Sequence, residues 1–180
     1  MLKAASLRSW SSAMAYAPLR RSLHVSRPAL IEKAASNFDA DAAAKRLNIT
    51  FETPGILAQA LTHKNFRNGT VPNNERLVLL GRRALELFTT ETAVQKFGVN
   101  APSSAISDYI KQYSLRHGAV LPDAFDKLDL EAGVQCDNNG TTQGTPSLVK
   151  SKAMSALIGA VYHDKGLQAA REFVKTHLLK

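Results

Sequence analysis

The sequence of 180 residues contains one cysteine, few aromatic residues (7%) and no apolar run near the roughly 20 residues that a membrane-spanning helix requires. The single cysteine, Cys136, excludes an internal disulfide and a zinc site built on paired thiolates. Hydrophobic residues still make up 44% of the chain, enough to form a core. The length fits one ordinary domain better than two. We therefore expect one folded domain and no membrane partner.

Acidic residues are absent from residues 1–31, whereas Lys and Arg occur there five times among several serines. A basic, serine-rich and acid-free N-terminus is typical of a mitochondrial transit peptide. Cleavage is expected between about Ser22 and Glu32, and loss of all of residues 1–31 would lower the net charge from +8 to +3. The alternative is a basic arm that stays on the chain and binds RNA. The first interpretation predicts a mature protein in the mitochondrial matrix.

The remaining sequence predicts an all-α fold. Helical periodicity, caps and prolines predict helices at 39–47, from 53–54, at 75–97, from 103 or 104, at 122–130, from 145–146 to Gly166, and at 167–179. The polar segments 65–74 and 137–144 are predicted to be loops. Helix 75–97 is apolar around much of its circumference and should run through the middle of the domain. Gly81 and Gly159, in the interiors of the two most apolar helices, predict a close approach between helices.

Three blocks of sequence carry a family resemblance. They read ALTHKNF at 60–66, NERLVLLGRRALEL at 74–87 and ALIGAVYHDKG at 156–166. In this order and spacing they resemble the ribonuclease III catalytic domain. The resemblance covers residues 48–180, after a transit peptide at 1–31 and an extension with a short helix at 32–47. It implies an all-α nuclease domain that dimerises and acts on double-stranded RNA. The RNA-binding domain that usually follows in this family is not expected here.

The resemblance also implies four metal-binding carboxylates, and these positions have changed. They fall on Val78, Arg82, Lys152 and Ser155, and Glu75 is the retained acid. Hard divalent cations require negatively charged oxygen ligands, whereas this set offers two cations and two neutral groups. From this pattern we predict a pseudo-ribonuclease III: no enzyme, no catalytic residue, no metal and no cofactor.

The same changes allow a role in binding RNA. The residues that we expect to contact RNA are basic: Lys64, Arg67, Arg82, Arg83, Lys150 and Lys152. The competing interpretation is a solvated surface, or a salt bridge to Glu75. Leu79 falls where the family places a dimer-contact residue, and His63 is expected to be structural.

These observations predict a structural constituent of the mitochondrial large ribosomal subunit. Its partners would be ribosomal RNA and other mitochondrial ribosomal proteins, with a second ribonuclease III-like chain forming a heterodimer. The alternative is a mitochondrial RNA-processing factor. That factor would be either an active endoribonuclease for double-stranded RNA or an adaptor that dimerises with one.

Overall fold

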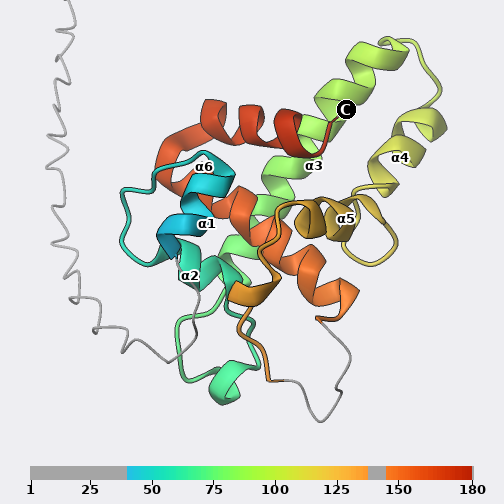
Figure 1. The fold of residues 1–180 in the computed structure, drawn as a ribbon. Helices are drawn as coiled ribbons and strands as arrows, with labels where there is room; N and C mark the ends of the chain where they lie inside the picture. Colours follow the sequence, from blue (N-terminus) through green and yellow to red (C-terminus); the bar gives the residue numbers. More distant parts are fainter. Residues whose placement is uncertain (1–39, 138–144, 180) are drawn as a thin grey trace, which may run out of the picture. The chain divides into compact units, whose positions relative to one another are not determined.

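The computed structural model describes residues 40–137 and 145–179, which form an all-α domain, as predicted (Figure 1). The helices are α1 (Ala40–Leu47), α2 (Ile56–Leu61), α3 (Glu75–Phe97), α4 (Ser103–Lys111), α5 (Val120–Lys127) and α6 (Ser147–His177), with short 3₁₀ helices η1 (Phe66–Gly69) and η2 (Glu131–Gly133). Within these ranges no helix is long and apolar enough to cross a membrane. The predicted transit peptide and most of the predicted loop 137–144 lie outside the described residues.

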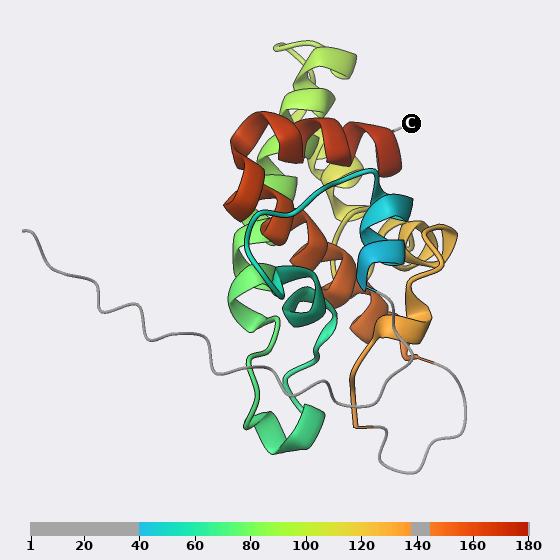
Figure 2. The same cartoon turned by 60° about the vertical axis from the view of Figure 1, so that its left-hand side comes forward.

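The domain is organised around the crossing of α3 and α6, which run through its middle (Figures 1 and 2). The two helices touch backbone to backbone at Gly81 and Gly159, as predicted. A Cβ atom on Gly81 would lie 1.8 Å from the carbonyl oxygen of Ser155, and one on Gly159 would lie 2.1 Å from that of Leu77. Any side chain at either position would force the helices apart. The crossing therefore fixes the distance between the two helices that carry the site described below.

Three predicted helix boundaries differ from the structure because of left-handed residues. Helix α2 begins at Ile56 rather than at Thr53-Pro54, since Gly55 has φ +75°. Helix α5 spans Val120–Lys127 rather than 122–130, and Asp129, just beyond it, has φ +50°. Gly166 has φ +82° and kinks α6, so the predicted stop is a bend between two helical halves. Left-handed backbone favours glycine and, less strongly, Asp or Asn.

Helix α3 runs through the middle of the domain, as predicted, but one of its faces is exposed. Ala84, Leu85 and Phe88 lie in the core. Leu79 and Leu87, by contrast, are 61% and 46% exposed. An apolar residue on the solvent-exposed face of a helix raises the apolar content of the sequence but does not contribute to the core.

Asp164 joins the bend of α6 to the segment before α2. Its carboxylate accepts hydrogen bonds from the backbone amides of Glu52 (2.7 Å) and Thr53 (2.8 Å), and its side chain is 1% exposed. Burial by itself raises the pKa of Asp164, but the hydrogen bonds from Thr53 and Glu52 and the charge of Lys165 outweigh it. The pKa therefore lies below its ordinary value. This contact holds the entry to α2 against α6.

We expect Asp164→Ala to lower the free energy of unfolding by about 2 kcal/mol at pH 7, because two amides lose their acceptor. Since the folded-state pKa is depressed, the contribution of Asp164 is present above the unfolded-state pKa. It is lost as the pH falls from about 4 through the lower folded-state pKa. Urea denaturation of both proteins between pH 7 and pH 3 measures this. A difference in stability that stays constant down to pH 3 would contradict the assignment.

Candidate functional site

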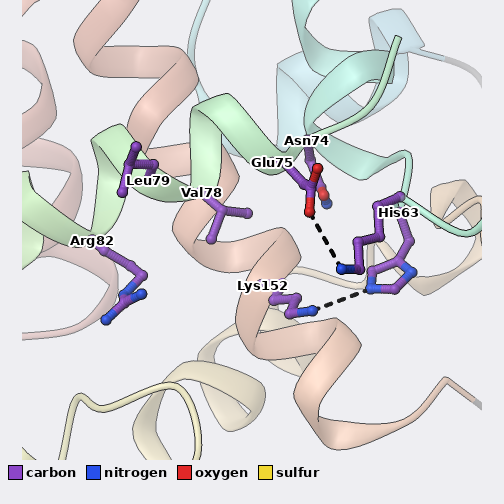
Figure 3. A pocket seen from close by; sticks show the side chains of 8 residues that line it. His63, Asn74, Glu75, Val78, Leu79, Arg82 and Lys152 are labelled. Atoms are coloured by element: carbon purple, nitrogen blue, oxygen red, sulfur yellow. Dashed lines mark hydrogen bonds and ion pairs between the residues drawn. The ribbon is translucent and has the colours of Figure 1, made fainter. Parts of the chain in front are cut away.

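A pocket opens between α3 and α6 close to the end of α2 (Figure 3). We call it the α3–α6 pocket; its cavity measures about 160 Å³. The side chains that line it are His63, Lys64, Asn74, Glu75, Val78, Leu79, Arg82 and Lys152. Residues 75, 78 and 82 share one face of α3 because they are three or four positions apart. Lys152 projects toward the same pocket from α6 (Figure 3). Segments nearly 90 residues apart in sequence thus build one site.

Backbone and amide hydrogen bonds place the beginning of α3 beside the end of α2. Asn74 is buried, its side chain donates to the carbonyl oxygen of Ala60 (3.1 Å), and its backbone amide donates to Thr62 (2.9 Å). The backbone amide of His63 donates to Gln135 (2.7 Å), beside an isolated parallel bridge between Thr62 and Gln135. These contacts hold the floor of the pocket in place before any ligand binds.

The pocket contains more positive than negative charge. Among the described residues that line it, Glu75 is the one carboxylate, and it lies 3.4 Å from Lys64 Nζ. Within the described part of the chain, Arg82 makes no ion pair or hydrogen bond. Lys152 Nζ lies 3.5 Å from His63 Nε2 and contacts no described carboxylate. Two cations of the pocket therefore remain unneutralised.

His63 is almost buried (9% exposed), which agrees with the structural role expected for it, and its ring orientation is fixed by a short contact. Its Nδ1 atom lies 2.6 Å from the side-chain oxygen of Asn65. The backbone amide of Asn65 also approaches Nδ1, but at the longer distance of 3.4 Å. Since the side-chain oxygen of Asn65 can only accept, we assign the proton to Nδ1, which leaves the lone pair of Nε2 facing Lys152. Asn65 is itself held by a hydrogen bond from its amide nitrogen to the carbonyl oxygen of Asp137 (2.9 Å).

The four positions that the family resemblance assigned to metal ligands do not all reach the pocket. Val78, Arg82 and Lys152 line it. Ser155 is completely buried, and its hydroxyl donates to the carbonyl oxygen of Ser151 (3.0 Å). Its carbonyl oxygen lies at the glycine contact with Gly81, where the helices leave no free volume.

The basic residues expected to contact RNA fall into two groups. Lys64, Arg82 and Lys152 line the α3–α6 pocket, whereas Arg67, Arg83 and Lys150 do not. Arg67 lies over the ring of Phe66 in η1, at 5.4 Å from the ring centroid, and Arg83 pairs with Glu86 at 3.1 Å.

Lys150 is neutralised by two acidic residues. Its Nζ atom lies 2.8 Å from Asp126 and 3.3 Å from Glu131. The hydrogen bond to Asp126 and, less strongly, the one to Glu131 raise the pKa of Lys150. Lys150 thus belongs to a local ion-pair cluster outside the pocket.

The donor set of the α3–α6 pocket does not fit Mg²⁺, the ion that the family resemblance implies. Mg²⁺ is held by carboxylates and water, and here one carboxylate faces three nearby cations. Across the described residues, no group of three or more His, Cys, Asp or Glu side chains could hold a metal ion. The described residues of this chain therefore do not form a Mg²⁺ site.

The protein is thus an all-α domain with a pocket where two helices cross at a glycine contact. The excess positive charge of this pocket suits an anion. Comparisons with known proteins identify this class. The Ribonuclease-III-like family matches residues 53–180, and the chain belongs to that family.

The chain is similar to several bacterial proteins named Ribonuclease 3. It is 34% identical over 135 residues to Ribonuclease 3 of Nitratiruptor sp. (71% of this chain, 55% of that protein). It is 36% identical over 135 residues to Ribonuclease 3 of Sulfurovum sp. (71% and 56%). The crystal structure of the nuclease domain of ribonuclease III from Campylobacter jejuni matches with a TM-score of 0.65 at 25% identity, covering 77% of this chain and 92% of that one. The chain thus spans little more than half the length of the curated relatives.

These relatives correct the prediction that the chain is not an enzyme. Proteins named Ribonuclease 3 and a solved nuclease domain point to a ribonuclease instead. The prediction was drawn from the ligand positions of one chain alone. Because nucleases of this family were expected to dimerise, the residues of one chain do not define the activity of the assembly.

Proposed function

We propose that this protein is an RNA-processing factor of the ribonuclease III family that acts on double-stranded RNA as one half of a dimer. The other chain supplies the metal-binding carboxylates, and this chain supplies positive charge for the RNA. The observation that carries the proposal is the family match over residues 53–180 together with the cationic α3–α6 pocket. Leu79 supports a dimer, because it is a large apolar residue exposed at the edge of that pocket.

Isolating the full chain together with its bound partners tests this proposal. We expect the purified complex to cleave an RNA duplex of about 30 base pairs when Mg²⁺ is added, and chelation with EDTA to stop cleavage. Replacing exposed Leu79 by Glu should release the second chain and abolish cleavage, while Leu167→Glu, at another exposed leucine, should leave both unchanged. A complex that retains its partner but never cuts the duplex would contradict the proposal.

A second candidate is a place in the mitochondrial large ribosomal subunit, with ribosomal RNA and a second ribonuclease III-like chain as partners. The acid-free, serine-rich residues 1–31 favour it, because they indicate import into the mitochondrial matrix. Under this proposal residues 1–31 are removed and residues 48–180 form the working domain. Sedimentation of mitochondrial lysate through a sucrose gradient separates the candidates, since a ribosomal protein co-sediments with the large subunit. An RNA-processing factor would remain in the lighter fractions.

A further inference from the structure

We propose that Arg82 and Lys152 together bind one phosphate group of the RNA backbone inside the α3–α6 pocket. The inference rests on the proposed RNA-directed function and assigns the ligand of its site. The two residues approach the pocket from different helices, Arg82 from α3 and Lys152 from α6 (Figure 3). A phosphate bound between them would contact both sides of the helix crossing.

The distribution of ion pairs around the pocket supports this assignment. Adjacent basic residues are paired with carboxylates: Arg83 with Glu86, and Lys150 with Asp126 and Glu131. By contrast, Arg82 and Lys152 have no carboxylate partner among the described residues, although each lies within two positions of a paired one. Basic side chains that are not neutralised internally retain their charge for an external anion.

The neutral contact to His63 directs Lys152 toward the pocket. Nε2 of His63 accepts from the ammonium group at 3.5 Å, and Asn65 fixes the ring that carries it. A neutral acceptor orients the ammonium group without cancelling its charge, as a carboxylate would. His63 is therefore a positioning residue for Lys152, and it uses one of the three donors of that ammonium group.

The size and lining of the pocket suit a phosphate group. A cavity of about 160 Å³ has room for a tetrahedral phosphate and some of its bound water, given about 30 Å³ for each water molecule. Arg82 can present two parallel N–H donors to phosphate oxygens, a geometry that lysine lacks. Val78 and Leu79 add apolar surface beside the charges, which lowers the local dielectric constant and strengthens charge–charge attraction.

Binding of a duplex RNA by the complex of the full chain with its bound partners, measured against salt concentration, tests the inference. We expect Arg82→Gln and Lys152→Gln each to weaken binding about tenfold, irrespective of RNA sequence. Neither single change should lower the slope of log K against log salt by more than about 0.9, the contribution of one phosphate contact. Because both residues bind the same phosphate, the double variant should lower the slope by about 0.9 as well, not by twice that amount. Glu75→Gln should strengthen binding, since it removes the negative charge of the pocket.

Matched controls are available among the other exposed basic residues. Arg116→Gln and Lys127→Gln remove exposed basic residues that do not line the pocket, and they should leave the affinity within about twofold. Thermal melting of each variant checks that it is folded. If the unmodified complex binds the duplex but the Arg82 and Lys152 variants bind equally well, the inference is wrong and the proposed function stands. If the unmodified complex binds no duplex, both are wrong. A double variant whose slope falls by about 1.8 overturns the shared phosphate.

Discussion

Replacing Gly81 by alanine should lower the free energy of unfolding by about 3 kcal/mol and the melting temperature by about 10 °C. The added methyl group would lie 1.8 Å from the carbonyl oxygen of Ser155 and 2.7 Å from the backbone nitrogen of Gly159. Backbone atoms cannot rotate away as side chains do, so α3 and α6 would have to separate. The gain of about 1 kcal/mol in helix propensity on going from glycine to alanine is too small to compensate. Denaturant unfolding followed by circular dichroism measures the loss.

Two further variants show whether the contact itself is responsible. Gly159→Ala should be equally costly, because its methyl group would lie 2.1 Å from the carbonyl oxygen of Leu77. Gly98→Ala should cost only about 1 kcal/mol, since open space surrounds that position and the strain comes only from φ +86°. Equal losses for Gly81→Ala and Gly98→Ala would mean that backbone strain, and not helix contact, sets the cost.

Restoring acidic residues to the pocket should exchange its ligand. The triple variant Val78→Glu, Arg82→Asp and Lys152→Asp is expected to bind Mn²⁺ with a Kd of about 0.1–1 mM, the range of weak carboxylate sites. Its affinity for duplex RNA should fall about a hundredfold, because two attractive charges become repulsive. Ser155 is left unchanged, since a glutamate there would be buried at the glycine contact without a partner. Isothermal titration with MnCl₂ and RNA binding at fixed salt measure both effects.

The neutral triple variant Val78→Gln, Arg82→Asn and Lys152→Asn is the matched control, with side chains of the same size and no charge. It should bind neither Mn²⁺ nor RNA well. Binding of Mn²⁺ to the unmodified chain at Glu75 with a similar Kd would contradict our description of the pocket. A loss of folding in the acidic variant alone would be visible by circular dichroism and would separate instability from a change of ligand.

Local sequence patterns predicted the fold well, because helix periodicity and glycine placement act over a few residues. The bounds of α3 and the contact between Gly81 and Gly159 are confirmed, whereas the predicted helix end at Gly166 is a bend within α6. The beginning of α2 was misplaced because a left-handed Gly55 follows the cap-and-proline signal. Proline permits a helix to begin but does not set the conformation of the next residue.

Side-chain pairing between distant segments could not be read from the sequence. The neutralisation of Lys150 depends on Asp126 and Glu131, and the orientation of Lys152 depends on His63, 89 residues earlier. Nothing in the local pattern distinguishes Lys150 from Lys152, two positions apart on the same helix. A family resemblance places residues on a scaffold, whereas their pairing depends on side chains that the resemblance does not specify.

The backbone contact at the crossing of α3 and α6 has a consequence for how such a protein can diverge. Since no side chain separates α3 and α6 at the crossing, the distance between the two helices does not depend on which side chains they present to the pocket. Acidic, basic or apolar side chains that line the pocket can be exchanged one at a time while the crossing of α3 and α6 stays intact. The chemistry of the pocket can therefore change while the geometry of the helix crossing is kept.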